Sequence, residues 1–383
     1  MKPLTIEIIG TGTHNRGAEL MAIAVSERIR RSFPDARIAV SPEFGATSDR
    51  RKYGFLDTTE FSGRRLGRLK TLALTAVGRW RRNTVKSSDV SIVLDASGFA
   101  FSDQWGAARV DQIVQLMSRR HRRHQTYIML PQALGPFNKP AVAEKSRLLF
   151  GRAELVCARD RQSYASVKEL VNHSGLRLYP DFTVDVSPVR GPHLSLPGRF
   201  VAIVPNYRML DKGEGEAYLE FVHQALITMK ELGLQPAFVL HDAEEDRRVI
   251  SLVNDRFAEQ IPILTDTDPR VLKAILGAAT FVIGSRFHAL VSSLSQGVPC
   301  IGAGWSHKYP ELFADFGCPE LLLSDLHDVD SLRSMIQLLS EDATRAPIAT
   351  RIGEAALNIK QRTAAMWEEV EAIIRARRQQ VKT

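Results

Sequence analysis

Short apolar runs alternate with helical stretches along this chain, and the alternation occurs in two separate series. Each apolar run is bounded by Gly, Pro or Asp, as expected for strands of a parallel sheet that is buried on both faces. The first series comprises LTIEIIG (4–10), DVSIVLDASG (89–98), QTYIMLPQALGPF (125–137), ELVCARD (154–160) and LRLYPDFTVD (176–185). The second comprises RFVAIVPN (199–206), LQPAFVLHD (234–242), IPILTD (261–266), TFVIGSRFHAL (280–290) and VPCIGAG (298–304). Regular strand–helix alternation favours a doubly wound α/β fold for each series.

A Pro- and Gly-rich window from Pro188 to Pro197 separates the two series and indicates a domain boundary. We therefore predict an N-terminal α/β domain over residues 1–190, a C-terminal α/β domain over 196–350, and a long helix within 351–383 that packs back across both. The expected fold class is α/β, with two doubly wound Rossmann-like domains facing across a cleft in the arrangement called GT-B-like. Ligands of such sheets bind at the carboxyl ends of the strands.

The composition excludes several classes of protein. The chain has 383 residues, 44% of them hydrophobic and 25% charged, which is typical of globular proteins. Apolar runs stay well short of the ~18 residues of a membrane-spanning helix, and the first residues lack the features of a signal peptide. The three cysteines (Cys157, Cys300 and Cys318) are far apart, which favours reduced core thiols over disulfides or a zinc site. We therefore expect a cytoplasmic protein.

One basic segment accounts for the net charge of +8, because eight cations and no acidic residue lie between positions 64 and 86. These cations are Arg64, Arg65, Arg68, Lys70, Arg79, Arg81, Arg82 and Lys86. Two interpretations stay open: a helix that lies on an anionic membrane surface, at the inner face of the cell membrane, or an ordinary amphipathic helix that covers a sheet. Nucleic-acid binding is disfavoured, because Trp80 is the only aromatic residue among these cations.

The most informative segment is FVIGSRFHALVSSLSQGVPCIGAGWSHKY at 281–309. A β-branched strand ends at Gly284 and places Ser285, Arg286 and His288 at the start of a helix. Such a junction offers unpaired backbone N–H groups and the positive end of a helix dipole, so it attracts anions. The Arg286 guanidinium fits phosphate or carboxylate, and the His288 imidazole exchanges a proton near neutral pH. The alternative is structural: an arginine that caps carbonyl groups and a histidine that fills the core.

Five blocks of sequence together resemble the polysaccharide pyruvyl transferase family. They are GTGTHNRGAELM (10–21), LDASGFAFSDQWG (94–106), LPQALGPF (130–137), VCARDRQSY with LYPDFTVD (156–164 and 178–185), and the 281–309 segment, which is the most specific. The resemblance implies a GT-B-like fold and transfer of the pyruvyl group of phosphoenolpyruvate to a sugar, usually as a ketal that bridges two hydroxyl groups. It also implies that Arg286 binds the anionic donor and that His288 acts as the acid/base.

The first loop departs from the pattern of the family. Many members read N-x-G-D there, whereas Asn15-Arg16-Gly17 is followed here by Ala18 and Glu19. The contact that the aspartate makes to the acceptor therefore falls on Glu19 or is absent. This departure concerns the acceptor and leaves the reaction class unchanged.

Further candidate residues follow strand ends in both series. Besides Arg286, the donor-binding candidates are Ser285, Asn206, Arg208, His307 and Lys308. The acceptor-binding candidates are Asn15, Glu19, Asp95, Ser97, Asp103, Gln132 and Asp181. Structural alternatives exist for them, since strand-end aspartates often cap helices and exposed cations are often only solvated. No carboxylate–histidine cluster has metal-ligand spacing, so we expect no metal and no cofactor, with phosphoenolpyruvate as co-substrate.

Three functions are compatible with these features. The first is pyruvyl transfer from phosphoenolpyruvate to a saccharide of a surface polysaccharide, or to its lipid-linked precursor. The second is a GT-B glycosyltransferase with a nucleotide-sugar donor, in which Arg286 would bind the pyrophosphate. The third is a non-enzymatic module that binds an acidic polymer through the basic segment. Donor binding distinguishes the first two, whereas the acceptor sugar, the ketal stereochemistry and the oligomeric state are open.

Overall fold

The computed structural model of the chain describes residues 3–58, 83–121, 125–191, 196–211, 215–241, 245–257, 260–304 and 306–380. Seven of the eight cations of the basic segment, those between positions 64 and 82, lie outside these residues. The expectation of a membrane-surface helix therefore concerns a part of the chain that the structure does not describe. The chain forms two compact units: unit 1 comprises 1–14, 21–181 and 362–383, and unit 2 comprises 15–20 and 182–361.

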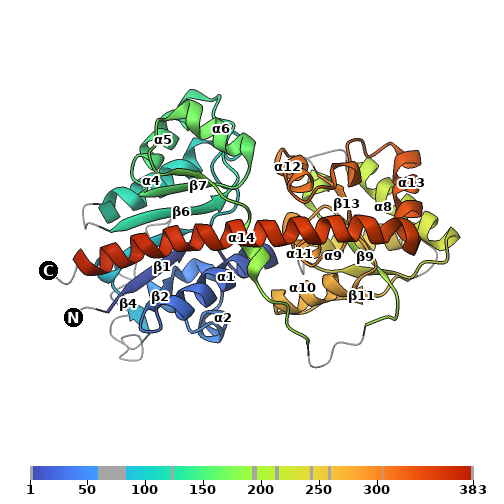
Figure 1. The fold of residues 1–383 in the computed structure, drawn as a ribbon, viewed down its shortest axis with the longest axis horizontal. Coiled ribbons are helices and arrows are strands. Elements are labelled where there is room, and N and C mark those ends of the chain that lie inside the picture. Colours follow the sequence, from blue (N-terminus) through green and yellow to red (C-terminus); the bar gives the residue numbers. More distant parts are fainter. Residues whose placement is uncertain are drawn as a thin grey trace. The chain divides into compact units, whose positions relative to one another are not determined.

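Unit 1 is built on a parallel sheet whose described strands run in the order β4-β3-β2-β1-β5-β6-β7-β8 (Figure 1). The strands are β1 (Thr5–Ile9), β2 (Arg37–Val40), β3 (Leu56–Thr58), β4 (Thr84–Val85), β5 (Ile92–Asp95), β6 (Thr126–Gln132), β7 (Leu155–Ala158) and β8 (Leu176–Leu178). The α-helices are α1 (Arg16–Ser32), α2 (Thr47–Lys52), α4 (Gly106–His121), α5 (Pro140–Phe150) and α6 (Arg161–Leu170). The strand order reverses between the neighbours β1 and β5, which is the topological switch point of this sheet.

Unit 2 repeats this plan with the described strand order β11-β10-β9-β12-β13-β14, again all parallel. The strands are β9 (Val201–Val204), β10 (Pro236–Val239), β11 (Ile263–Leu264), β12 (Val282–Gly284), β13 (Cys300–Ala303) and β14 (Leu322–Leu323). The α-helices are α7 (Arg208–Asp211), α8 (Gly215–Glu231), α9 (Glu245–Asn254), α10 (Pro269–Ala278), α11 (Phe287–Leu294), α12 (Lys308–Asp315), α13 (Val329–Ser340) and α14 (Asp342–Gln380). The switch point of this sheet lies between β9 and β12.

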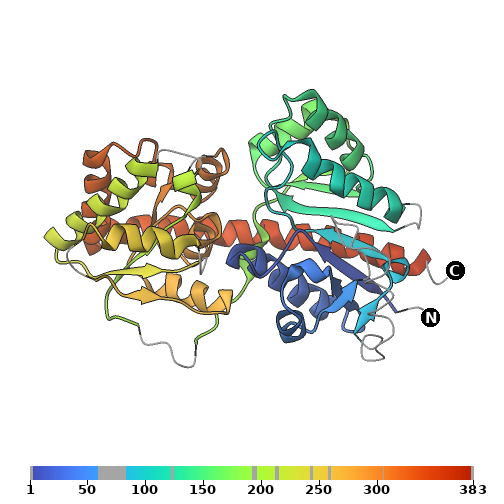
Figure 2. The ribbon, with the colours of Figure 1, turned by 180° about the vertical axis from the view of Figure 1, so that it is seen from behind.

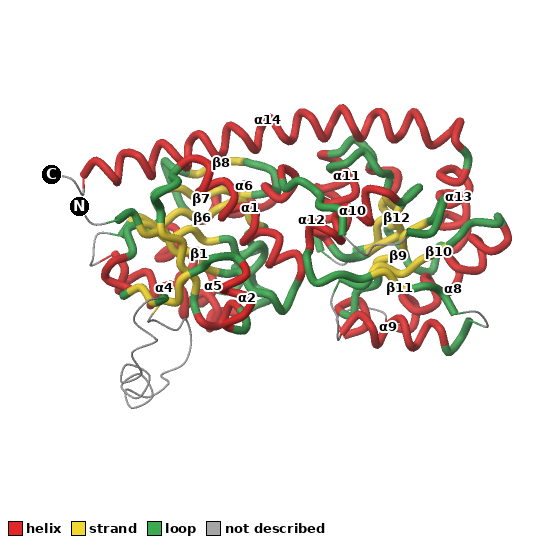
Figure 3. Tube along the Cα trace, turned by 90° about the horizontal axis from the view of Figure 1, so that it is seen from below, coloured by secondary structure: helices red, strands yellow, loops and turns green. Residues whose placement is uncertain are grey.

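Helices cover both faces of each sheet, as Figures 2 and 3 show. The central strands are buried along their whole length, for example β1, β5 and β9, which explains why their sequences are mostly apolar. This confirms the predicted fold class of two parallel-sheet α/β domains with a long C-terminal helix. The three cysteines are buried free thiols, as expected. Within the described residues, no helix is both long and apolar enough to cross a membrane.

The boundary between the units differs from the expected one. It falls between Asp181 and Phe182, before the Pro188–Pro197 window, and the short 3-10 helix Phe182–Asp185 belongs to unit 2. The reason is a buried contact, because the Lys273 amine donates to the carbonyl oxygens of Thr183 (2.9 Å) and Val184 (3.2 Å). The helix α14 also begins at Asp342, nine residues before the expected 351, and its two parts belong to different units.

Candidate functional site

The two strands at the switch point of unit 2 deliver the centre of the site. The strands β9 and β12 are hydrogen-bonded neighbours; Ser285 follows β12 directly, and Asn206 follows β9 after Pro205. The Asn206 side-chain amide donates to the Ser285 carbonyl oxygen at 2.7 Å. Both residues are buried, and the Tyr218 hydroxyl contacts both, at 3.0 Å from the Asn206 nitrogen and 2.6 Å from the Ser285 hydroxyl. The structure thus gives these two donor-binding candidates an internal role in fixing the strand ends beside Arg286.

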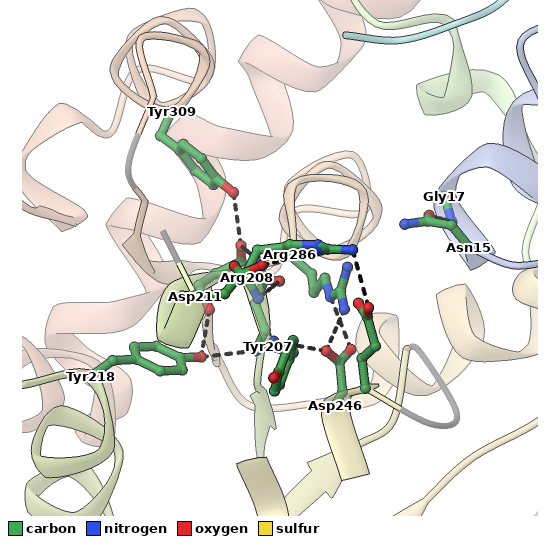
Figure 4. A network of polar contacts seen from close by, with 12 residues as sticks. Asn15, Gly17, Tyr207, Arg208, Asp211, Tyr218, Asp246, Arg286 and Tyr309 are labelled. Atoms are coloured by element: carbon green, nitrogen blue, oxygen red, sulfur yellow. Dashed lines mark hydrogen bonds and ion pairs between the residues drawn. The ribbon is translucent and has the colours of Figure 1, made fainter. Parts of the chain in front are cut away.

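Arg286 is held by a carboxylate that the sequence analysis missed (Figure 4). Its Nε donates to Asp246 Oδ2 at 2.9 Å, and its Nη2 donates to Asp246 Oδ1. Asp246 lies in the first turn of α9 with a fully buried side chain, and it also accepts the Tyr207 backbone N–H at 3.0 Å. The contact occupies the Nε edge of the guanidinium, which carries two further N–H groups on Nη1. Asp246 therefore fixes the direction of the Arg286 guanidinium.

Arg208 lies at the start of α7, at the carboxyl end of β9. Its guanidinium pairs with Asp211 at 2.7 Å and with Glu245 at 3.1 Å, and 42% of the side chain is exposed. Ion pairs at this exposure contribute little, about 0–1 kcal/mol, so an anionic ligand can replace these partners at small cost. The structure thus places Arg208 and Arg286 after neighbouring strands, β9 and β12, of the same sheet.

His288 is the second residue of α11 and packs against the start of α1, in the segment 15–20 that belongs to the same unit. A Cβ on Gly17 would lie 2.3 Å from His288 Nδ1, so only glycine permits this approach. The Asn15 side-chain oxygen accepts the backbone N–H groups of Gly17 (2.8 Å) and Ala18 (3.2 Å) and thereby caps α1. These contacts assign Asn15 to the unit of His288, whereas the sequence placed it in the N-terminal domain.

Glu19, predicted as an acceptor contact, is buried and pairs with Arg16 at 2.5 Å. Arg16 was not among the site residues predicted from the sequence, but its charge is one of those that affect the pKa of His241. Burial and the positive charges of Arg286, His288 and Arg16 lower the pKa of His241 to about 3. His241 follows β10 and is buried, and the sequence gave no motif for it. The His241 imidazole is therefore neutral at physiological pH.

The remaining donor candidates lie at the start of α12. The Lys308 ammonium is 5.4 Å from the ring centres of both Phe287 and Tyr309, and Phe287 lies edge-on to the His288 ring at 5.5 Å. The Tyr309 hydroxyl donates to the Ser285 carbonyl oxygen at 2.8 Å, which ties α12 to the end of β12. His307, directly before the helix, is half-buried. Lys308 is thus placed next to the aromatic neighbour of His288.

The acidic acceptor candidates of unit 1 are engaged in internal contacts. Asp95 is fully buried and accepts the hydroxyl groups of Ser97 (2.5 Å) and Tyr127 (2.6 Å), and burial raises the pKa of its carboxyl group against the effect of these hydrogen bonds. Asp103 accepts the backbone N–H groups of Asn138 (2.7 Å) and Lys139 (3.1 Å). Asp181 forms a buried ion pair with Arg159 at 3.1 Å. These three carboxylates stabilise loops and strand ends through internal contacts. Such contacts are the structural alternative to ligand binding that the sequence left open.

Ser97 and Gln132 complete the acceptor candidates. Ser97 is half-buried at the end of β5, and Gln132, the last residue of β6, is fully buried. Neither polar atom of the Gln132 side chain has a hydrogen-bond partner among the described residues.

The residues that the structure describes contain no cluster of three or more His, Cys, Asp or Glu side chains that could hold a metal ion.

The contact between Gly17 and His288 leads to a first prediction. Gly17→Ala places a methyl group where the imidazole lies, so we expect the fold to persist, His288 to move, and kcat to fall by about tenfold or more. Gly353→Ala in α14 is the matched control, because a Cβ there meets nothing within 4 Å and should slightly stabilise the helix. Steady-state kinetics and melting temperatures of both variants measure the effect. Wild-type kcat in Gly17→Ala would contradict the placement of His288.

His241 leads to a prediction on acid stability. The unfolded imidazole binds a proton near pH 6.5, whereas the folded one does so only near its pKa of about 3. Between these values the unfolded chain binds the extra proton, so the free energy of unfolding falls as pH falls. His241→Gln should flatten this decline by up to about 1.4 kcal/mol per pH unit. Urea denaturation of both proteins between about pH 7 and pH 4 measures the difference. If the free energy of unfolding changes with pH equally in both proteins, His241 is not buried in its neutral form.

Comparisons with known proteins place the chain in a family. The model of the family "Polysaccharide pyruvyl transferase" matches residues 15–307, which contain both switch-point strands of unit 2 and the 281–309 segment as far as His307. Similar solved structures include Staphylococcus aureus MnaA with UDP (11% identity, TM-score 0.56, covering 93% of this chain and 95% of that one). Others are Anabaena Alr3699/HepE with UDP and glucose (11%, 0.55, 96% and 99%) and the Neisseria meningitidis UDP-GlcNAc 2-epimerase with UDP-GlcNAc (10%, 0.53, 95% and 100%). At these identities the structures show a shared GT-B-like fold alone, whereas the family match covers most of the sequence. The chain belongs to the polysaccharide pyruvyl transferase family.

Proposed function

We propose that the protein transfers the pyruvyl group of phosphoenolpyruvate to a sugar of a surface polysaccharide or of its lipid-linked precursor, and forms a ketal. The observation that carries this proposal is the geometry at the carboxyl edge of the unit 2 sheet, where Asp246 holds the Arg286 guanidinium by two hydrogen bonds and the His288 imidazole packs against Gly17. A small ligand with two anionic groups suits such a site. Family membership supports the reaction class.

Phosphoenolpyruvate carries a phosphate and a carboxylate on a three-carbon frame, so it requires cationic groups on more than one side. Arg286, with its direction fixed by Asp246, is the central ligand in this proposal. Arg208 reaches the same edge from α7, and Lys308 with His307 reaches it from the start of α12. Guanidinium groups and backbone dipoles would stabilise the departing phosphate without a metal.

The reaction requires one proton to move to carbon and another to move to phosphate. His288, as an imidazolium, donates a proton to the methylene carbon, and the adjacent carbon becomes an oxocarbenium-like centre. A sugar hydroxyl attacks this centre and returns its proton to His288, and loss of phosphate followed by attack of a second hydroxyl closes the ketal. The second hydroxyl proton leaves with the phosphate, so the products are the ketal, with a new methyl group, and inorganic phosphate.

The experiment uses phosphoenolpyruvate with a panel of simple pyranosides and lipid-linked sugars in D₂O. We expect phosphate release that depends on the acceptor, and a product whose new methyl group carries one deuterium. Parallel reactions with UDP- and GDP-sugars test the glycosyltransferase alternative. Nucleotide release with these donors, and none of phosphate from phosphoenolpyruvate, would replace the proposed function with that alternative.

A further inference from the structure

The switch point of unit 1 is a second strand edge at which a ligand is expected to bind. It lies between β1 and β5, and Gly10 and Ser97 follow these strands. Gly10 has a φ of +78°, and a Cβ on it would lie 2.1 Å from the Ser97 hydroxyl. The two loops therefore meet closely at this edge. The nearby carboxylates of Asp95 and Asp103 are engaged within the unit, so recognition at this edge must rely on other side chains.

Trp105 is a large aromatic side chain exposed at this part of unit 1. It ends the loop between β5 and α4, and 41% of its surface is exposed. The Phe99 ring packs edge-on against it, with ring centres 6.1 Å apart and planes at 79°. Its backbone N–H donates to the Ser102 carbonyl oxygen at 3.2 Å. An exposed indole held in this way offers a rigid apolar face at low entropic cost.

The loop that carries Trp105 is tied to the loop that follows Gln132. The Ala133 N–H donates to the Gly98 carbonyl at 2.8 Å, and the Gly135 N–H donates to the Phe101 carbonyl at 2.9 Å. Two fully buried polar side chains of these loops, Gln132 and Ser102, have no side-chain hydrogen-bond partner among the described residues. Because unpaired buried polar groups oppose folding, their retention where these two loops are tied together indicates a site for a ligand with polar groups.

We propose that Trp105 is the stacking platform for a pyranose ring of the acceptor saccharide, with the Gln132 amide as a polar partner of its hydroxyl groups, directly or through water. That the occupant is a saccharide rests on the proposed function. A pyranose has a C–H face that suits the negative face of an indole, and a rim of hydroxyl groups that needs hydrogen-bond partners. An amide, which both donates and accepts, matches a hydroxyl group in either role.

The test is saturation-transfer NMR with a defined probe, a mixture of methyl β-galactopyranoside, methyl β-glucopyranoside and methyl α-mannopyranoside at millimolar concentration. With wild-type protein we expect transfer to the protons of one pyranose face. Trp105→Ala should abolish this transfer, and Trp105→Phe should retain part of it. Leu148→Ala is the matched control, because Leu148 in α5 is 44% exposed in the same unit and is not part of these loops. Equal saturation transfer to the pyranosides in wild type and Trp105→Ala, or no transfer in wild type, would contradict the proposal that Trp105 stacks against a pyranose ring.

Gln132→Leu provides a second readout. We expect this variant to melt at a higher temperature than wild type, since it removes an unpaired buried amide, and to show weaker transfer to the same probe. A lower melting temperature with unchanged transfer would assign Gln132 a purely structural role and remove it from the site. Because these measurements need no phosphoenolpyruvate, a failure of the platform is distinguishable from a failure of the pyruvyl-transfer proposal.

Discussion

His288→Gln is expected to lower kcat by about 10²-fold or more, the usual contribution of a general acid–base group, while the fold and the affinity for phosphoenolpyruvate stay close to wild type. Glutamine has a similar reach but cannot exchange a proton near neutral pH. The position of His288, two residues after Arg286 and directly against Gly17 in the first turn of α1, places its imidazole at the start of α11 beside the donor-binding candidate Arg286. A loss in kcat with an unchanged donor KM is therefore the signature of this role.

His223→Gln is the matched control for that substitution. His223 lies in α8 of the same unit, where its ring packs edge-on against Phe257 at 6.1 Å, away from Arg286 and His288 in the sequence. Its kinetics should equal those of wild type. Near-normal turnover in His288→Gln, measured as phosphate release, would exclude His288 as the acid/base.

Asp246→Ala should have the largest effect on stability. Asp246 is fully buried and its partner Arg286 is only 11% exposed, so removal of the carboxylate leaves a desolvated guanidinium without its charge partner. Breaking such a buried pair costs about 3–5 kcal/mol, and the Tyr207 backbone N–H loses its acceptor as well. The same variant should bind phosphoenolpyruvate more weakly, because Arg286 loses its fixed direction.

Urea denaturation of Asp246→Ala, Arg286→Met and the double variant measures this coupling. The double variant should recover part of the lost free energy of unfolding, since it no longer buries an unpaired charge. Asp211→Ala serves as the control, because Asp211 contacts the exposed Arg208 and its loss should cost no more than about 1 kcal/mol. If Asp246→Ala and Asp211→Ala lower the free energy of unfolding by the same small amount, Asp246 does not act as a buried residue that positions Arg286.

The sequence predicts those parts of the fold and site that depend on local patterns. Apolar runs that end at Gly, Pro or Asp located most strands, and the strand-to-helix junction at Gly284 placed Arg286 and His288 at the carboxyl edge of a sheet. The long helix was predicted within 351–383, yet α14 begins at Asp342 and includes Pro347 near its start.

Long-range contacts explain what the sequence could not predict. Asp246 and Arg286 are 40 positions apart, and no local pattern pairs them. The role of Gly17 depends on His288, in a different part of the chain, and the low pKa of His241 depends on its burial and on the charges of residues distant in the sequence. Conversely, a strand-end aspartate such as Asp95 has the pattern of a ligand, but Tyr127 on the neighbouring strand β6 binds its carboxylate and buries it.

Calorimetric titration of the purified protein with phosphoenolpyruvate, and separately with UDP-N-acetylglucosamine, tests the proposed donor most directly. We predict saturable binding of phosphoenolpyruvate that weakens about 10- to 100-fold in Arg286→Lys, because an ammonium cannot both keep the two contacts to Asp246 and bind an anion. UDP-N-acetylglucosamine should not bind. Saturable binding of the nucleotide sugar with no heat from phosphoenolpyruvate, or an affinity for phosphoenolpyruvate that is unchanged in Arg286→Lys, would contradict a phosphoenolpyruvate site at Arg286.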